Sequence, residues 1–333
     1  MLQGRQPGTA SNSLGSFTQK FTKAYNELVP EKHPRMQSRL PGTPSGPAHT
    51  QWCLHHDPTV ETRKEPWGVE IVSHILLLYT TSKWRADVEA LWSFLNGEYI
   101  VTANNNCSTH VHISLAKGYS VSDLKNLAAS VIYFEPALEA LVPPNRRGNE
   151  YARSNWIDNA NFGYKKKLRS ESIAMIMKCG IDEEVINLMN PRGERYFGWN
   201  FLALRKYKTI EFRRGAASLS VRDAFMWVEL AVSFVLAALR LGSAQELTAI
   251  PATVGGLRAF MSQAKLENAL GQKNPPHVNR LFQDRVKDER VDPIPVGDLT
   301  PEKRLKLKKK IEADAKSDPM LDRLKSAQAS GTI

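Results

Sequence analysis

The sequence predicts one α+β domain over residues 51–241, built around an antiparallel sheet. Short segments rich in β-branched residues, such as residues 68–78, favour strands. Longer segments with apolar residues at helical spacing, such as residues 84–95, favour helices. Gly, Asn and Pro punctuate the chain between the two kinds of segment, so strands and helices are mixed along it.

The composition is that of an ordinary globular protein. The chain has 333 residues, of which 42% are hydrophobic, so it is long enough to bury a full core. Its longest uncharged apolar run, residues 230–239, is too short to cross a bilayer, and the first residues contain no apolar signal stretch. Cys53, Cys107 and Cys179 lack the spacing of a disulfide framework or of a structural zinc site. We therefore expect a cytoplasmic, intracellular protein without a membrane span.

The formal net charge of +11 raises the question of an anionic partner. Basic residues gather at residues 165–169 and in the tail after Leu299, and neither group is interleaved with the aromatic residues that stack on bases. We therefore interpret both groups as solvated basic surface and do not expect a nucleic-acid partner.

Changes in composition along the chain predict a division into three regions. Residues 1–50 are rich in Gly, Pro, Ser and Thr and favour a flexible arm, with a short helix only at residues 16–28. Residues 51–272 form the predicted catalytic domain, and residues 273–333 form a charged linker and a basic helical tail. Thr300 is a suitable cap for the tail helix, but its apolar stripe is weak, so we expect the tail to be dispensable for folding.

Strands and helices follow one another in a definite order within the predicted domain. In its first half they are residues 51–56 (strand), 68–78 (strand), 84–95 (helix ending at Gly97), 100–103 and 109–115 (a hairpin across the turn 104–106), and 122–141 (a helix containing Pro136). In its second half they are residues 170–190 (two short helices), 200–204 and 209–212 (strands flanking the loop 205–208), 221–241 (a buried helix) and 254–270 (helix).

Polar side chains share faces of these strands. Because side chains alternate along a strand, His110 and His112 lie on one face, opposite Val111 and Ile113. Thr209, Glu211 and Arg213 likewise share a face, and so do Glu70, Val72 and His74, whereas Asn200 is expected on the face of Leu202 and Leu204. Carboxylates, imidazoles and guanidiniums placed together in this way suit a site for a divalent metal and phosphate.

Each of these signals also has an ordinary structural explanation. His110 and His112 fit a plain strand face, and Glu211 with Arg213 fits a salt bridge in a sheet. Asp57 precedes Pro58 and Thr59, which is typical of a turn that the aspartate caps. The order and spacing of the signals, rather than any single one, favour a functional site.

The order of these segments resembles the amidoligase family, whose relatives are glutamine synthetase and glutamate-cysteine ligase. The matching segments are residues 52–57 with Thr59, 68–73 (Gly-Val-Glu-Ile-Val-Ser), 107–113 (Cys-Ser-Thr-His-Val-His-Ile), 146–151, 200–204, 209–213 (Thr-Ile-Glu-Phe-Arg) and 227–228. Together they cover about residues 51–241 in the order of the family.

The resemblance implies a glutamine-synthetase-like antiparallel sheet with helices packed on one face. It also implies an ATP-dependent carboxylate-amine ligase that uses Mg²⁺ or Mn²⁺ and acts through an acyl phosphate. By position, it assigns Asp57, Glu70, His110 and Glu211 to metal binding, and Glu211, Arg213 and Arg146 to catalysis. It assigns His112, Asn200 and Arg213 to cofactor binding, although His112 could instead only support His110.

The chain departs from the family pattern at three places. Ser108 stands where the family has Gly, and His74 stands where Pro follows Ser73. No Gly-x-Glu-x-Glu strand occurs upstream of Trp52, so we expect weaker metal binding and an open sheet edge that favours self-association.

Three functions therefore compete. The first is a ligase that joins small-molecule or peptide carboxylates to amines; a homo-oligomer is left open. The second is a binding module that has kept the sheet but lost the activity. The third is a metal hydrolase that uses His110, His112 and an acid.

Overall fold

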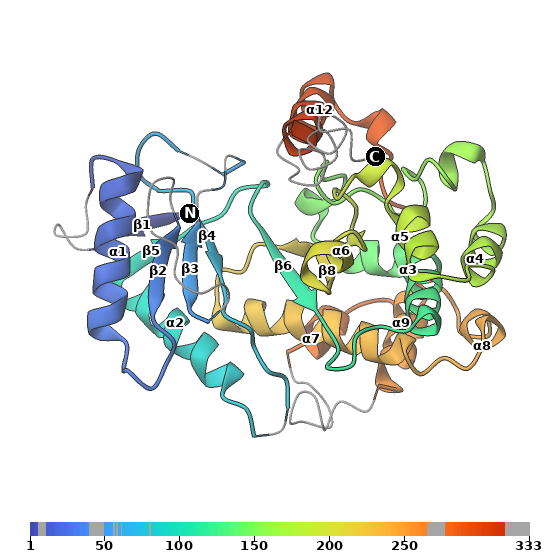
Figure 1. Cartoon of the computed structure of the whole chain (residues 1–333), viewed down its shortest axis with the longest axis horizontal. Coiled ribbons are helices and arrows are strands. Elements are labelled where there is room, and N and C mark those ends of the chain that lie inside the picture. The colour runs from blue at the N-terminus through green and yellow to red at the C-terminus, as the bar shows by residue number, and fades with distance from the viewer. Residues whose placement is uncertain are drawn as a thin grey trace, which may run out of the picture. The chain divides into compact units, whose positions relative to one another are not determined.

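The computed structural model describes residues 1–5, 11–39, 50–55, 57, 59–60, 62–79, 81–264 and 277–316. The chain divides into two compact units. Unit 1 comprises residues 1–109, 215–240 and 258–285, and unit 2 comprises residues 110–214, 241–257 and 286–333. Each unit combines helices with small sheets, which confirms the predicted α+β class (Figure 1).

Unit 1 contains two small sheets and the helices around them. Its elements are β1 (Leu2–Gly4), α1 (Leu14–Leu28), β2 (Met36–Arg39), β3 (Trp52–His55), β4 (Glu70–Val72), α2 (Trp84–Glu98), β5 (Tyr99–Val101), α7 (Val221–Ala238) and α11 (Asn279–Phe282). Strand β1 pairs with β5, whereas β2, β3 and β4 form a second sheet in that order.

Helix α1 carries an aromatic stripe into the core of unit 1. Ser13 caps the helix by accepting a hydrogen bond from a backbone N–H of the first turn. Phe17, Phe21 and Tyr25 follow at intervals of four residues and are completely buried. Helix α1 thus confirms the helix predicted at residues 16–28, whereas the strands β1 and β2 were not predicted, and the Gly- and Pro-rich residues 40–49 lie outside the described residues. The predicted domain limits at residues 51 and 272 stay a prediction.

The second strand predicted for the domain is shorter than expected. Strand β4 ends at Val72, not near residue 78, because its partner β3 extends only one residue beyond the Cys53–Val72 pair. Ile75 and Leu77, which follow, are exposed. Strand β2 pairs with the other side of β3 in the parallel direction, so this sheet is not purely antiparallel.

The predicted hairpin at residues 100–115 does not form. The turn itself is present, with the Cys107 N–H bonded to the Asn104 carbonyl at 3.1 Å. However, β5 pairs with β1, and β6 (Ser108–Ile113) is a neighbour of β8 instead. A turn reverses the chain but does not determine which strands pair across it.

Helix α7 is the buried helix that the sequence predicts. It begins after the cap residue Ser220 and carries Glu229, which is 0% exposed. The Glu229 carboxylate accepts hydrogen bonds from Arg85 Nη2 at 2.9 Å and from the backbone N–H groups of His277 and Val278. These bonds compensate the buried charge and fasten the segment that leads into α11.

Unit 2 is built around the long helix α3. Its elements are most of β6, α3 (Val121–Leu141), α4 (Arg169–Met177), α5 (Asp182–Met189), β7 (Trp199–Asn200), α6 (Ala203–Tyr207), most of β8 (Ile210–Ala216), α8 (Ala244–Thr248), the first residues of α9 (Val254–Ser262) and α12 (Pro301–Lys316), with 3₁₀ turns at Pro144–Arg146, Gly163–Lys165, Pro191–Gly193 and Val296–Asp298. The division between the units falls within β6, β8 and α9. A capping box of Ser120 and Asp123 starts α3, and α4, α5 and α8 pack against it.

The sheet of unit 2 has the strand order β6-β8-β7. Strands β7 and β8 are antiparallel, as the sequence predicts, and their register places Asn200 opposite Glu211. The strand predicted over residues 200–204 is wrong beyond Asn200, because Ala203–Tyr207 forms the short helix α6. The single predicted sheet is also wrong, because the described strands form three small sheets.

The basic tail begins with an ordered helix. The Thr300 hydroxyl accepts a hydrogen bond from the Lys303 N–H at 3.4 Å at the start of α12, as predicted. Leu299 and Leu307 are 8% and 4% exposed, and Lys303 lies 3.9 Å from Glu150. Leu305, by contrast, is 52% exposed, so the described part of the helix buries little beyond Leu307, and its dispensability for folding stays a prediction.

Among the described helices, none combines the length and the apolar composition needed to cross a bilayer.

Candidate functional site

Strands β6 and β8 bring four of the predicted side chains together in unit 2. Val111 and Ile113 are buried on one face of β6, while His110 and His112 project from the other face. Glu211 and Arg213 alternate in the same way on β8 and lie against the two histidines. The alternation that the sequence predicts thus produces one polar cluster.

Glu211 is the centre of this cluster. Its Oε1 atom lies 2.5 Å from Arg213 Nη1 and 3.5 Å from both His110 Nδ1 and His112 Nε2. Its Oε2 atom accepts a hydrogen bond from Asn200 Nδ2 at 2.7 Å, across the β7–β8 pair. With 5% of its side chain exposed, Glu211 is a buried carboxylate that hydrogen-bond donors hold in one orientation.

Arg213 is fixed by contacts along its length. Its Nε atom donates to the Tyr151 carbonyl at 3.2 Å, and its guanidinium lies 5.6 Å from the centre of the Tyr196 ring. Arg146, at the end of a 3₁₀ turn, donates from Nη2 to the Arg213 carbonyl at 3.3 Å. The structure therefore brings both predicted arginines to the same stretch of β8.

His112 connects the cluster with solvent. Its Nδ1 atom lies 2.9 Å from Thr209 Oγ1, and its ring meets the Tyr207 ring edge-on at 5.8 Å. Its side chain is 41% exposed, compared with 27% for His110 and 5% for Glu211. A ligand that approaches from this side meets His112 first.

The electrostatics of the cluster keep one of two neighbouring groups charged and the other neutral. Burial alone would raise the pKa of Glu211, but Arg213, with help from the two histidines, lowers this pKa well below its ordinary value. Burial, followed by the charge of Arg213, lowers the pKa of His110 well below its ordinary value. At neutral pH an ionised Glu211 therefore faces a neutral His110.

The other two predicted metal ligands belong to unit 1. Asp57 Oδ1 accepts hydrogen bonds from the N–H and from the hydroxyl of Thr59, both at 2.8 Å, which is the turn-capping role that the sequence left open. Glu70 is exposed on the edge strand β4, opposite His55. Within the described part of the chain, no group of three or more His, Cys, Asp or Glu residues is arranged to hold a metal ion.

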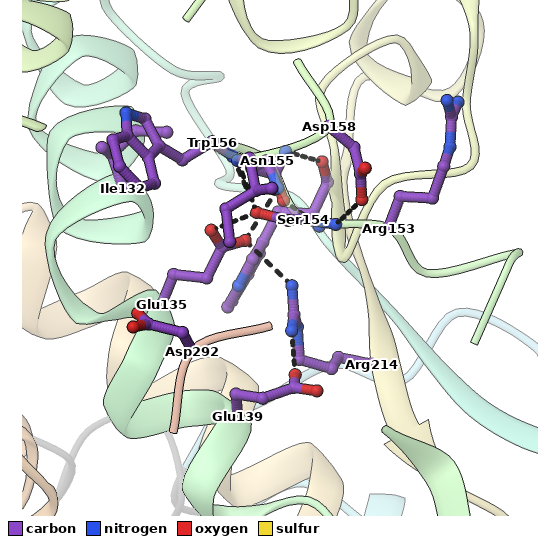
Figure 2. Close-up of polar contacts among 12 residues, drawn as sticks. Ile132, Glu135, Glu139, Arg153, Ser154, Asn155, Trp156, Asp158, Arg214 and Asp292 are labelled. Carbon is purple, nitrogen blue, oxygen red and sulfur yellow. Dashed lines mark hydrogen bonds and ion pairs between the residues drawn. The ribbon is translucent and has the colours of Figure 1, made fainter. Parts of the chain in front are cut away.

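A second polar network lies on the other side of β8, and sequence analysis missed it. Arg214 forms ion pairs with Glu135 and Glu139 of α3 (Figure 2). A small cavity beside this network is lined, among others, by Glu139, Asp158 and Arg214 and by Ile294, Val296 and Leu299. The sequence does contain a signal for this network: two glutamates lie four residues apart in an otherwise apolar helical segment. Buried acids require a cation, so this pattern predicts a basic partner.

Comparison with protein families now gives this site a context. Residues 17–235 match the family described as "Putative amidoligase enzyme", a match that extends from α1 to the second half of α7. The match covers more than half of the chain, and it includes β6, β7 and β8 with the whole polar cluster. The chain therefore belongs to the amidoligase family, as the order of its segments indicates, and this membership points to a ligase.

Comparisons with curated proteins and with solved structures found no match.

Proposed function

We propose that this chain is an ATP-dependent carboxylate-amine ligase that uses Mg²⁺ or Mn²⁺ and works through an acyl phosphate on a glutamine-synthetase-like sheet. One observation carries the proposal: an ionised, buried Glu211 is held between Arg213, Asn200 and two histidines, one of which reaches solvent. Family membership supports the reaction class. The substrates would be a small-molecule or peptide carboxylate and an amine.

The proposed reaction has two steps. The substrate carboxylate attacks the terminal phosphoryl group of ATP, which gives an acyl phosphate and ADP. The amine then attacks the acyl carbon, and phosphate leaves as the amide bond forms. Both steps develop negative charge on oxygens, so fixed cations and hydrogen-bond donors accelerate them.

Arg213 is the group that we assign to this developing charge, with Arg146 beside it. Among the described residues, Glu211 and Tyr151 engage two of the five N–H groups that a guanidinium carries. These two bonds fix the plane of the guanidinium, and further N–H groups are left to bind a phosphate or carboxylate oxygen. Neutral His110 lies beside the same carboxylate and suits proton transfer to or from the amine.

The donor set fits a divalent metal in a limited way. Mg²⁺ in phosphoryl-transfer sites is commonly held by one or two carboxylates together with substrate phosphates. Glu211 supplies one such carboxylate, and Arg213 Nη1, at 2.5 Å, occupies the position that a cation would take. Bound there, the metal would supply charge neutralisation at the transferring phosphoryl group; Asp57 and Glu70 stay proposals for further ligands.

The experiment compares the protein with its Glu211→Gln variant. Native mass spectrometry with and without Mg-ATP reports nucleotide and metal binding, and ADP release with pooled carboxylates and amines reports turnover. We expect the protein to bind Mg-ATP and the variant to lose turnover, because Gln keeps the shape of the side chain but not its charge. In thermal denaturation the melting temperature of the protein should rise with Mg-ATP. Ligand at 100 times its dissociation constant stabilises the folded state by about 2.7 kcal/mol.

Chemical denaturation of the same variant separates catalysis from folding. Because Glu211 pairs with the buried Arg213, we expect a loss of about 1–3 kcal/mol, more than a purely catalytic group would cost. A protein whose melting is unchanged by millimolar Mg-ATP, and which retains no nucleotide in native spectra, would contradict the ligase proposal.

A second candidate is a binding module that has lost the ligase activity. The observation in its favour is that neither β1 (Leu-Gln-Gly) nor β2 (Met-Gln-Ser-Arg) carries an acidic residue. Fewer hard oxygen ligands would weaken metal binding. Nucleotide binding without ADP release, under any carboxylate and amine tested, would favour this module.

A further inference from the structure

The network behind β8 is completely enclosed, unlike the cluster in front of it. Arg214 is 4% exposed, and its side chain points towards Glu135 and Glu139 (Figure 2). Because side chains alternate along a strand, this is the side of β8 opposite Arg213. Its Nη2 atom lies 2.9 Å from Glu135 Oε1, and its Nη1 atom bonds Glu139. Glu135 and Glu139 are 1% and 2% exposed. Two buried carboxylates thus share one buried guanidinium.

Glu135 also binds a second segment of unit 2. Its Oε2 atom accepts the Ser154 hydroxyl at 2.6 Å, and its Oε1 atom accepts the Asn155 N–H at 2.7 Å. The Asn155 side chain in turn makes two hydrogen bonds to Trp199 in β7: Nδ2 donates to the carbonyl, and Oδ1 accepts from the N–H, both at 2.8 Å. Glu139 makes neither kind of contact among the described residues.

Glu135 is therefore linked to both strands that carry the candidate site. Through Arg214 it holds β8 one residue from Arg213, and through Asn155 it holds β7 one residue from Asn200. Arg213 and Asn200 are the two residues that donate to Glu211 at 2.5 and 2.7 Å.

We propose that Glu135 is a positioning residue: it fixes β7 and β8 so that Asn200 and Arg213 both reach Glu211. A role of Glu135 in catalysis rests on the proposed ligase function, whereas its role in fixing the two strands does not. Hydrogen bonds of this kind are short and directional, and a shift of about 1 Å in a reacting group has a large effect on rate. A buried, fully paired carboxylate is suited to this task because it has few alternative positions.

Glu139 provides a matched control. Glu135→Gln and Glu139→Gln each remove one negative charge from Arg214, and both positions lie one turn apart on the same buried helix. Only the first variant disturbs the bonds to Ser154 and Asn155. Glu135→Asp is the third variant, because it keeps the charge but withdraws the carboxylate by one methylene. A purely electrostatic role would be rescued by aspartate, whereas a positioning role would not.

Two measurements are made on the full chain and on each variant. Amide hydrogen exchange of peptides covering residues 198–202 and 210–214 reports the two strands, with peptides from α2 as the reference for global unfolding. Calorimetric titration with Mg-ATP reports the site. For Glu135→Gln and Glu135→Asp we expect exchange near residue 199 to rise about tenfold, the order expected for one lost buried hydrogen bond, and Mg-ATP affinity to fall by about as much. For Glu139→Gln we expect little change near residue 199.

The outcomes are distinguishable. If the unmodified protein binds no nucleotide, the ligase proposal fails, and the exchange comparison alone decides the positioning role. Equal exchange near residue 199 in the Glu135→Gln and Glu139→Gln variants would overturn that role, as would a complete rescue by Glu135→Asp. If the Glu135 variants do not fold, Asn155→Ala replaces them, because it cuts only the link to β7 and changes no charge. Unchanged exchange near residue 199 in Asn155→Ala would then overturn the proposal.

Discussion

Strand β8 separates two arginine–carboxylate networks that use the same chemistry in different surroundings. In front, Glu211 and Arg213 lie beside two histidines, and the His112 side chain is 41% exposed. Behind, Arg214 is enclosed by Glu135 and Glu139, and no histidine belongs to the described part of that network (Figure 2). The front network therefore presents a histidine to solvent, while the three charged side chains of the back network are buried.

One strand can thus serve structure on one side and chemistry on the other. An enclosed ion pair contributes orientation more than net stability, because desolvation offsets much of its attraction. A partly open ion pair keeps donors for an incoming ligand but depends on its surroundings for geometry. Placing the two networks on adjacent residues, Arg213 and Arg214, lets one orient the other.

The largest expected effect comes from opening the back network. Arg214→Met should lower the free energy of unfolding by about 3–5 kcal/mol, because two buried carboxylates lose their cation. Arg205→Met is the control: its partner Glu183 is 46% exposed, so the loss should stay below about 1 kcal/mol. Urea denaturation of both variants measures this. Equal losses would mean that the enclosed network is no more costly to break than a surface pair.

The two sides of β8 should also respond to pH with opposite signs. Burial raises the pKa of Asp158, beside the back network, from 3.8 to about 6. The folded protein then binds this proton more tightly than the unfolded protein does. The free energy of unfolding therefore decreases as the pH rises from about 4 to about 6, by up to about 3 kcal/mol. The lowered pKa of Glu211 acts in reverse: its contribution is present above its unfolded pKa and is lost as the pH falls through its folded pKa.

Single substitutions separate these two slopes. Asp158→Asn should remove the fall between pH 4 and pH 6, and Glu211→Gln should remove the loss on the acid side. Denaturation curves collected from pH 3 to pH 7 provide the measurement. A curve for Asp158→Asn that runs parallel to that of the unmodified protein would show that the Asp158 proton does not control stability.

A smaller effect is expected from removing the tail helix α12. Deletion of residues 301–333 exposes the pocket of Leu307, which is 4% exposed, and breaks the Lys303–Glu150 contact. Burial of one leucine is worth about 1.5–3 kcal/mol, so we expect a loss of about 2 kcal/mol instead of the unchanged melting temperature that the sequence predicts. Leu307→Ala in the full chain is the matched variant. A melting temperature within one degree for both would restore the sequence-based prediction.

The smallest effect concerns the open rim of the front network. Thr209→Val removes the hydroxyl that bonds His112 Nδ1 at 2.9 Å, and because His112 is partly solvated the stability cost should be about 1 kcal/mol or less. Mg-ATP affinity should fall a few-fold, while Thr209→Ser should bind as the unmodified protein does. Titration calorimetry of the two variants with Mg-ATP measures these affinities. Identical Mg-ATP affinities for Thr209→Val and Thr209→Ser would show that the Thr209 hydroxyl does not hold His112.

Local patterns in the sequence predicted the front network better than the back one. Alternation along β6 and β8 identified His110, His112, Glu211 and Arg213, because a strand fixes which side chains share a face. The antiparallel pairing of β7 with β8 was predicted correctly, but the length of β7 was overestimated, since residues 203–207 fit a strand or a helix equally well by periodicity.

Long-range pairing was beyond the reach of these patterns. The pairing of β1 with β5 brings together residues about one hundred positions apart, and no local turn encodes it. The contact between Arg214 and the two glutamates of α3 is similar, because helical spacing marks a buried face but not what lies against it. The standing of Asp57 and Glu70 as metal ligands stays a prediction for the same reason.

Asn155 has a further consequence at the end of this sheet. Strand β7 is the outermost strand of the order β6-β8-β7, and an outermost strand normally leaves N–H and carbonyl groups available to another chain. At Trp199 both groups are already bonded to the Asn155 side chain, which makes the two hydrogen bonds that an added strand would make. The Arg153 backbone pairs with the residues just before β7, where its carbonyl accepts from the Gly198 N–H at 2.8 Å. The Asn155 side chain thus extends the closure of this edge to Trp199, and resistance to aggregation becomes a second reason for an asparagine at this position.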